Sequence, residues 1–187
     1  KELFRIDQLY RNYHTRAEAA QGQGWDLLKV LSEEVEKAYD QGFIQPLGME
    51  CSRHLEQGLL ESWTAEKLPA QQDFYADVIA PHLSIAERKR AFVIISDAFR
   101  YEAAEQLAEA LNGKYRMDAD LSAMLGVLPS YTSLGMASLL PHKELSYNVK
   151  GEVLADGLST SGTAPRSKLL SAVDGVAIPA DKLLKLK

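Results

Sequence analysis

One carboxylate stands out because of its place in the chain. Asp97 comes two residues after the apolar run of residues 91–95 and just before a predicted helix. Ligands of open α/β sheets bind at the carboxyl ends of strands, so a carboxylate there can hold a metal ion, accept a proton or bind a ribose. The alternative is that Asp97 caps the helix predicted to begin near Ala98. The residues leave both interpretations open.

A basic side chain follows in an unusual position. Arg100 falls in the first turn of that predicted helix, where the helix dipole disfavours a positive charge. A nearby anion would compensate, which indicates either a phosphate or a paired acid. The structural alternative, which the residues favour, is a bridge from Arg100 to Glu102, to Glu105 or to a neighbouring segment.

Three hydroxyl side chains crowd a second turn: Ser130, Thr132 and Ser133. A helix is predicted over residues 132–140, and a helix N-terminus favours phosphate or a developing oxyanion. A hydroxyl there acts as a nucleophile when a metal ion or a base lowers its pKa. Ordinary N-capping by Ser130 or Thr132 is the more frequent role of such a motif. If both turns serve one site, Asp97 and Thr132 should lie roughly 4–8 Å apart at one end of a sheet.

The histidines and the cysteine form no site of their own. His14 and His54 fall on predicted helices, His82 falls in a connector, and none has a partner at metal-ligand spacing. Cys51 lies on an apolar helix face, which predicts packing in a core.

The second half of the chain supplies the elements that must position these residues. Residues 91–95 are a short, β-branched apolar run, which predicts a central parallel strand buried on both faces. A helix over 98–111 follows, and residues 115–121 are a second candidate strand. Two further strands, over 144–148 and 152–155, are expected to join around Lys150-Gly151, before a helix over 164–173. Alternation of this kind predicts an α/β layered domain.

The first half is predicted to be helical throughout, with a boundary near Arg88-Lys89-Arg90. Apolar residues recur every three or four positions in successive segments, which is typical of amphipathic helices. The segments are separated by Gly22 and Gly24, by Gly42-Pro46 and by Leu68-Pro69. The apolar positions comprise Leu3, Ile6, Leu9, Tyr10 and Tyr13; Trp25, Leu28, Leu31, Val35, Ala38 and Tyr39; and Leu47, Cys51, Leu55, Leu59 and Trp63.

Composition limits the classes of protein. The 187 residues carry 21 basic and 26 acidic side chains, a net charge of -5, and this acidic balance argues against non-specific coating of nucleic acid. No apolar run is long enough to span a membrane and no signal-peptide pattern is visible, which predicts a cytoplasmic protein. A single cysteine excludes a disulfide framework within the chain. Because the chain begins at Lys1 and ends in Lys187, we expect it to be part of a longer protein.

Two segments together resemble a known family, the PglZ domain. They are Phe92-Val93-Ile94-Ile95-Ser96-Asp97-Ala98-Phe99-Arg100-Tyr101-Glu102 and Leu128-Pro129-Ser130-Tyr131-Thr132-Ser133-Leu134-Gly135-Met136-Ala137-Ser138-Leu139-Leu140-Pro141. The resemblance implies membership of the alkaline phosphatase superfamily, an α/β/α sandwich with a two-metal site, and a place in bacterial phage-defence systems of the BREX type. Residues 1–88 resemble the helical region that precedes this domain in BREX type 1 proteins. Residues 89–187 would then be the N-terminal part of an incomplete sandwich.

The resemblance also implies roles for particular residues. Asp97 matches the aspartate that binds metal after the first strand, and Thr132 matches the hydroxyl that is both nucleophile and metal ligand. Arg100 is a candidate orienting group, and zinc is the expected metal. The family's further Asp and His ligands have no counterpart here, because His142, Asp156, Asp174 and Asp181 lie in other contexts. The missing Asp and His ligands of the family are expected beyond Lys187, so the chain alone should be inactive.

Two functions remain after this comparison. The first is a metal-dependent phosphohydrolase, a phosphatase or phosphodiesterase with a threonine nucleophile, whose substrate is a phosphate ester and could include a nucleotide or nucleic acid. The second is a non-catalytic assembly module, in which the helical half docks other defence-system proteins and the α/β half is a scaffold. A receiver-like or nucleotide-binding module is a third class, but it needs acidic clusters or glycine-rich loops that the sequence lacks.

Overall fold

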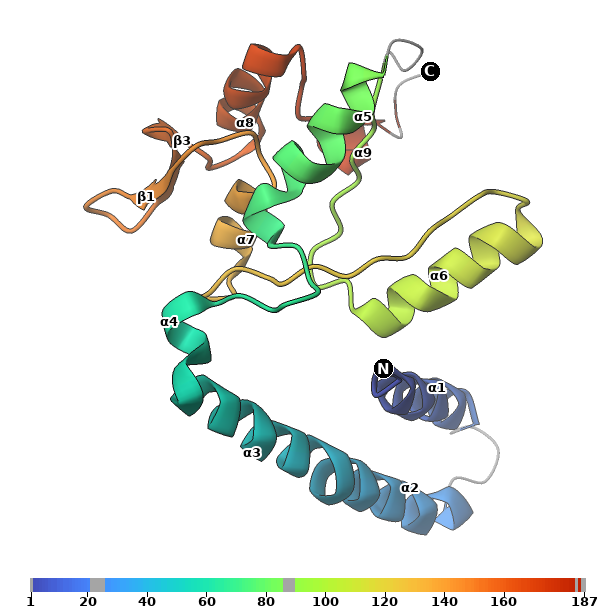
Figure 1. Ribbon diagram of the computed structural model, residues 1–187. Coiled ribbons are helices and arrows are strands. Elements are labelled where there is room, and N and C mark those ends of the chain that lie inside the picture. Colours follow the sequence, from blue (N-terminus) through green and yellow to red (C-terminus); the bar gives the residue numbers. More distant parts are fainter. Residues whose placement is uncertain (1, 21–25, 86–89, 184, 186–187) are drawn as a thin grey trace. The chain divides into compact units, whose positions relative to one another are not determined.

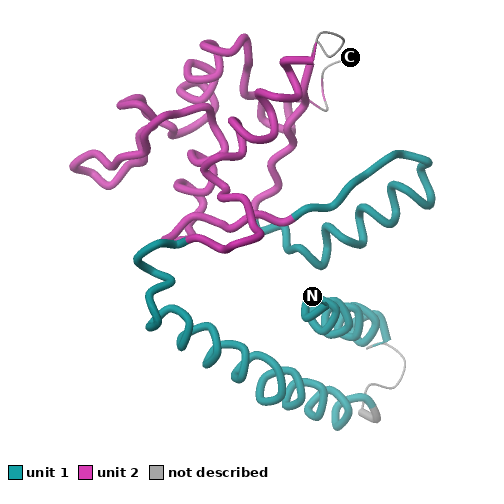
Figure 2. Tube along the Cα trace, viewed as in Figure 1, with its two compact units in different colours: residues 1–63, 98–122 teal, residues 64–97, 123–187 magenta. Residues whose placement is uncertain are grey.

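The computed structural model describes residues 2–20, 26–85, 90–183 and 185. The chain divides into two compact units, each built from segments that are far apart in the sequence (Figure 2). Residues 1–63 and 98–122 form the first unit, and residues 64–97 and 123–187 form the second. The sequence predicted two consecutive regions with a boundary near residue 88. The two compact units are interleaved along the chain, so they do not test that boundary, which stays a prediction. Arg88 and Lys89, like Gly22, Gly24 and Trp25, lie outside the described residues.

The first unit contains helices and, in its described residues, no strand; residues 115–122 follow the last helix as an irregular segment (Figure 1). Its helices are α1 (Phe4–Ala20), α2 (Asp26–Tyr39), α3 (Gln45–His54), α4 (Leu60–Ser62) and α6 (Tyr101–Lys114). Two π-helical turns, η1 (Asp40–Ile44) and η2 (Leu55–Leu59), join α2, α3 and α4. The sequence predicted that Gly42 ends the second helix. This prediction is wrong, because Gly42 lies inside η1 and the helical backbone continues past it. The helical run instead kinks at Gly58, whose φ is 101°, and ends at Trp63, whose backbone is left-handed, with a φ of 39°.

The apolar face predicted along residues 47–63 is not packed into a core. Leu47 is 43% exposed and Cys51 is exposed, while Leu55, Leu59 and Trp63 are half-buried. The expectation that Cys51 packs in a core is therefore wrong. Periodicity shows that one helix face is apolar, but burial requires a second element against that face.

The second unit combines short helices with a small antiparallel sheet (Figure 1). Its helical segments are η3 (Gln71–Asp73), η4 (Tyr75–Ile79), α5 (Ala80–Ser84), α7 (Thr132–Ser138), α8 (Thr163–Leu170), η5 (Ser171–Val173) and α9 (Ala180–Leu183). The sheet runs in the order β1 (Leu145–Tyr147), β2 (Val153–Ala155), β3 (Leu158–Ser159). The hairpin predicted over residues 144–155, with its turn around Lys150-Gly151, is confirmed.

Two small apolar clusters hold this unit together. Leu134 and Ala137 of α7 pack against Val153 of β2, and Leu140 packs with Ala155 and Leu169. Side chains alternate across a strand, so Val153 and Ala155 both face the helices. The helices predicted over 132–140 and 164–173 are confirmed within a few residues.

The strand predicted over residues 91–95 is wrong for this structure. The segment is extended but lies in no sheet, and Phe92 and Ile94 are 83% and 88% exposed. No hydrogen bond joins the backbone of residues 91–96 to another described residue. A buried parallel strand needs neighbours on both edges and both faces, and the described part of the chain supplies neither. The candidate strand over 115–121 is likewise unpaired.

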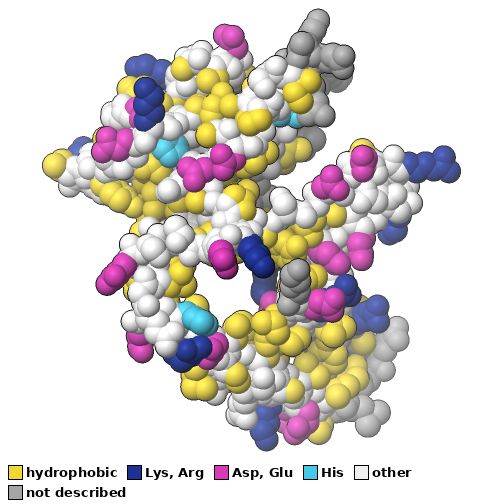
Figure 3. All heavy atoms as spheres, viewed as in Figure 1, with side chains coloured by type: hydrophobic (Ala, Val, Ile, Leu, Met, Phe, Trp, Pro, Cys, Tyr) yellow, Lys and Arg dark blue, Asp and Glu magenta, His cyan; other side chains and the backbone are white. Residues whose placement is uncertain are grey.

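The expected absence of strands from the first 85 residues is confirmed for the described residues, apart from two isolated bridges. Large apolar side chains are exposed in both units, and hydrophobic atoms are visible on the surface of each (Figure 3). No helix in the described part of the chain is long and apolar enough to cross a membrane.

Candidate functional site

Asp97 and Thr132 lie side by side in the second unit. The Thr132 hydroxyl donates a hydrogen bond to Asp97 across 35 positions of sequence, with Oγ1 and Oδ2 3.3 Å apart. This is closer than the predicted distance, although longer than the 2.5–3.0 Å or so of a strong O–H···O bond. Both side chains are exposed, so a ligand can reach them from solvent. The two residues therefore meet as predicted, without the sheet that was expected to bring them together.

Asp97 does not cap a helix. The helix predicted from Ala98 begins at Tyr101, and its N-cap is Arg100, with no side-chain cap hydrogen bond. Ala98 delays the helix because its φ of 55° is left-handed, a backbone conformation that alanine rarely adopts. The carboxylate is thus placed by a tight turn, and the capping alternative for Asp97 is wrong.

Thr132 is the first residue of α7 and is not an N-cap either. Tyr131 occupies the N-cap position, again with no side-chain cap hydrogen bond, so the capping expected of Ser130 or Thr132 is absent from this helix. Because α7 has only seven residues, its dipole is small, and we do not assign phosphate binding to its N-terminus. The chemistry rests on the pair of side chains.

Gln71 supports α7 from a distant segment, and sequence reasoning missed it. Its side-chain amide donates to the Gly135 carbonyl at 2.9 Å, and its side-chain oxygen accepts from the Val127 amide at 3.3 Å. The Gln71 backbone amide also donates to the Leu125 carbonyl at 2.8 Å. One glutamine therefore links η3 to both the loop before Thr132 and the helix that carries it. A lone polar residue between helical segments carries no sequence signal for such a role.

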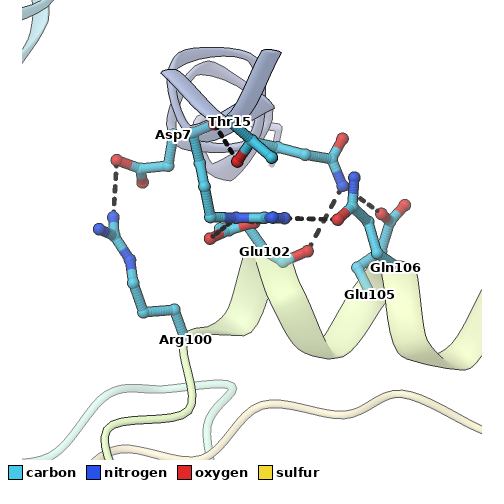
Figure 4. A network of polar contacts seen from close by, with 8 residues as sticks. Asp7, Thr15, Arg100, Glu102, Glu105 and Gln106 are labelled. Atoms are coloured by element: carbon cyan, nitrogen blue, oxygen red, sulfur yellow. Dashed lines mark hydrogen bonds and ion pairs between the residues drawn. The ribbon is translucent and has the colours of Figure 1, made fainter. Parts of the chain in front are cut away.

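Arg100 belongs to the first unit and is engaged there. Its guanidinium forms an ion pair with Asp7 of α1 at 2.8 Å (Figure 4). A hydrogen bond with Tyr39, together with the charge of Asp7, raises the pKa of Arg100 above its ordinary value. The sequence favoured a bridge to a neighbouring segment, and Asp7 is such a partner. The orienting role of Arg100 stays a prediction.

Glu102 is buried and belongs to the same network (Figure 4). Arg11 donates to both of its carboxylate oxygens, from Nε at 2.8 and 3.0 Å and from Nη2 at 2.7 Å. Gln8 donates to Glu105 at 2.8 Å, one turn further along α6. These contacts attach α1 to α6 through polar side chains.

Asp156 and His142, two of the residues weighed as further ligands, have structural partners. Asp156 accepts hydrogen bonds from the backbone amides of Glu144 and Lys143, which lower the pKa of its carboxyl. His142 contacts the Leu140 carbonyl through Nδ1 at 2.7 Å. A hollow of about 360 Å³ is lined by His142 and Glu144, among other residues, but not by Asp97 or Thr132. Within the described ranges, no group of three or more His, Cys, Asp or Glu side chains is placed to hold a metal ion.

Comparison with known proteins places these residues in a family. Residues 74–187 match the family described as the BREX system PglZ alkaline phosphatase-like domain. The chain belongs to the PglZ family.

Two relatives extend the match beyond that region. The alkaline phosphatase-like protein BrxZ of Escherichia coli O9:H4 (strain HS) is 42% identical over 190 residues, which cover 100% of this chain and 22% of BrxZ. The alkaline phosphatase-like protein PglZ of Bacillus cereus (strain H3081.97) is 37% identical over 166 residues, which cover 89% of this chain and 19% of that protein. The chain thus spans about a fifth of the length of these relatives. No solved structure matches. The mixture of helices and a small antiparallel sheet is compatible with the alkaline phosphatase-like domain.

Proposed function

We propose that the chain contributes Asp97 and Thr132 to the centre of a metal-dependent phosphohydrolase, a phosphatase or a phosphodiesterase. The observation that carries the proposal is the 3.3 Å contact between the Thr132 hydroxyl and the Asp97 carboxylate. Neither side chain caps a helix, so the usual structural role of such residues does not account for the pair. The names of both relatives contain the words "alkaline phosphatase-like", which supports phosphoester chemistry.

The donor atoms of this pair suit a divalent metal ion. A carboxylate and a hydroxyl both offer oxygen ligands, and zinc is the ion that we propose, with two ions in the complete domain. Zinc takes about four ligands, so the other ligands belong to other parts of the polypeptide. When bound, the ion supplies Lewis acidity, which lowers the pKa of a ligating hydroxyl and stabilises charge on phosphoryl oxygens.

The residues of this chain have separate tasks in the proposed reaction. Thr132 Oγ1 attacks phosphorus while the bond to the leaving oxygen breaks. Asp97 Oδ2, which accepts the hydrogen bond of that hydroxyl, takes up its proton as the bond to phosphorus forms, and the leaving oxygen departs with the electron pair of the broken bond. Arg100 is the proposed orienting group for phosphoryl oxygens. Since Asp7 holds its guanidinium here, that role requires Arg100 to exchange partners.

The proposal includes an incomplete α/β/α sandwich over residues 89–187. Residues 91–95 combine large apolar side chains with an unpaired, extended backbone, as expected of a strand whose neighbours come from elsewhere in the polypeptide. The helical region of residues 1–88 would precede this domain. The family to which the chain belongs also supports a role in phage defence beside other defence-system proteins.

An assembly module is the alternative function, and one observation favours it. Leu47 and Cys51 lie four positions apart on one face of α3, and both are exposed. An apolar helix face of this kind is typical of a docking surface. In this alternative the protein contributes contacts to a defence complex and no catalysis.

The two functions are separated by substitutions at Thr132 in the intact protein. Thr132→Ala should abolish hydrolysis of an aryl phosphate or aryl phosphodiester, because it removes the nucleophile. Thr132→Ser should retain part of the activity. Asp97→Ala should weaken metal binding, and chelation of the wild-type protein should reproduce its loss of activity. The exposed hydrogen bond contributes only about 1 kcal/mol to the free energy of unfolding, so the variants should fold.

Ser133→Ala is the matched control, because it removes the neighbouring exposed hydroxyl and should leave turnover unchanged. Full metal-dependent turnover by Thr132→Ala would exclude Thr132 as the nucleophile. The assembly module, or a different nucleophile, would then be the better account.

A further inference from the structure

Gln71 is hydrogen-bonded to the chain on both sides of Thr132. Its Nε2 donates to the Gly135 carbonyl at 2.9 Å, after Thr132 in the chain, and its Oε1 accepts from the Val127 amide at 3.3 Å, before it. The backbone of Gln71 is held as well, because its amide donates to the Leu125 carbonyl at 2.8 Å. One side chain therefore ties both ends of the segment that carries the candidate nucleophile to η3, within the second unit.

The bond to Gly135 holds the side of α7 on which Thr132 lies. An α-helix turns by roughly 100° per residue, so Gly135 lies about 60° from Thr132 around the helix axis and nearly one turn further along it. Leu134 and Ala137, which pack against the sheet, lie roughly 200° and 140° from Thr132, on the opposite side. Apolar burial therefore holds one side of α7, and the Gln71 amide holds the side that presents Thr132.

We propose that Gln71 is a positioning residue, which holds α7 so that the Thr132 hydroxyl stays beside Asp97 during attack on phosphorus. The inference rests on the proposed function, and it adds to that site a residue that acts through the helix. A displacement of about 1 Å at the reacting atoms can lower a rate about a hundredfold. Gln71 also precedes the residues that match the PglZ family, which begin at residue 74. The segment before that match therefore contributes to the proposed centre.

The two side-chain hydrogen bonds together require a primary amide at position 71. An amide donates through its nitrogen and accepts through its oxygen at the same time, whereas an ionised carboxylate only accepts and a thioether has no donor. Gln71→Glu would therefore keep the contact with the Val127 amide, but it would place an oxygen against the Gly135 carbonyl. Gln71→Met would keep the length of the side chain and lose both bonds. The two substitutions thus separate the bond to the loop from the bond to the helix.

Turnover of an aryl phosphate or aryl phosphodiester by the intact protein tests this role. Gln71→Met should lower kcat about 10–100-fold and leave KM unchanged, because it displaces the nucleophile and removes no contact with substrate. Gln71→Glu should lower kcat to a similar extent although it keeps the bond to the loop, since the bond that it loses lies on the Thr132 side of α7. Gln72→Met, at the neighbouring exposed glutamine, is the matched control and should retain wild-type turnover.

A double variant separates positioning from a loss of stability. Gly135→Ala should stabilise α7, because alanine is a better helix former than glycine. The added methyl group would lie 3.6 Å from Gln71 Nε2, an ordinary van der Waals distance. Combined with Gln71→Met, it should restore the stability of the helix but not kcat. Hydrogen exchange of residues 132–140 measures that stability, and circular dichroism reports the folded fraction to which each rate is normalised.

The outcomes distinguish this inference from the proposed function. Wild-type kcat in Gln71→Met or Gln71→Glu, an equal loss in Gln72→Met, or recovery of kcat in the double variant would overturn the positioning role alone. Full turnover by Thr132→Ala would overturn the proposed function, and the positioning role with it. Hydrogen exchange of residues 132–140 needs no substrate and should be faster in Gln71→Met than in Gln72→Met. Equal exchange in these two variants would overturn the positioning role whatever the turnover.

Discussion

In the unit that contains α1 and α6, the least exposed side chain described is a carboxylate, Glu102 at 2%, and only Ala17 and Phe43 are buried apolar residues. In the unit that contains α7 and the sheet, the least exposed residues are small: Ala137, Ser138 and Ala155, each at 0%. The first unit relies on directional contacts, such as the Arg11–Glu102 pair and the stacked rings of Tyr10 and Tyr39. The second relies on apolar burial.

Because the two units are stabilised by different interactions, substitutions in them should change the free energy of unfolding in different ways. Apolar burial depends on volume, so truncation of a side chain should be costly and salt should matter little. A polar network depends on partners, so removing one partner leaves the other without its hydrogen bonds. Substitutions in the two units should therefore respond differently to side-chain size, to salt and to pH.

The largest effect is expected in the second unit. Leu134 is 6% exposed in the cluster with Ala137 and Val153. Leu134→Ala should lower the local free energy of unfolding by about 2–4 kcal/mol, because it removes buried methyl groups and leaves a cavity. Hydrogen exchange of residues 132–155 in the intact protein measures this change. Leu158→Ala, at a 39% exposed position, is the control; an equal loss at both positions would contradict the assignment of the core.

A smaller effect is expected at Glu102. Glu102→Gln removes the charge that pairs with Arg11 and should lower the local free energy of unfolding of α1 and α6 by about 2 kcal/mol. The value is below that of a fully buried pair because the Arg11 side chain is 40% exposed. Hydrogen exchange should show a smaller difference in the free energy of unfolding between the wild-type protein and Glu102→Gln at high salt than at low salt. Glu105→Gln is the matched control; a loss as large there, or none at Glu102, would contradict the network.

The smallest effect is a pH dependence of the hairpin. The backbone amides of Glu144 and Lys143 lower the pKa of Asp156 from its ordinary value of 3.8. A carboxyl with a lowered pKa stabilises the folded state above its ordinary pKa, and this contribution is lost as the pH falls through the lowered value. Asp156→Asn should remove that dependence below pH 3.8 in hydrogen exchange of residues 143–156. Asp174→Asn should keep it, and an unchanged acid profile in Asp156→Asn would count against the contact.

Local pattern predicted local structure well. The hairpin around Lys150-Gly151 and helices α7 and α8 follow from turn residues and periodicity, which act within a few positions. The proximity of Asp97 and Thr132 was also predicted, although the strand that motivated it does not form here. Their catalytic roles remain predictions.

Other features depend on contacts that no local pattern encodes. The apolar positions of α1 suggested a packed face, yet Ile6 and Leu9 are 38% and 69% exposed. The contact with α6 is made by the polar side chains of Gln8 and Arg11 and by the ring of Phe4 against Tyr101. The pairing of Arg100 with Asp7 joins residues more than ninety positions apart. The late start of α6 follows from the left-handed backbone of Ala98. An alanine in a sequence gives no indication that its backbone will be left-handed.

The open segment of residues 91–96 also bears on how the protein is made. Phe92-Val93-Ile94-Ile95 is uncharged, free of proline and made of one aromatic and three β-branched residues, the composition of segments that form cross-β aggregates. As long as this backbone has no neighbouring strand, it can pair with the same segment of another chain. Newly synthesised protein should therefore be most prone to aggregation during that interval, and yield on expression should depend on how soon the segment is covered.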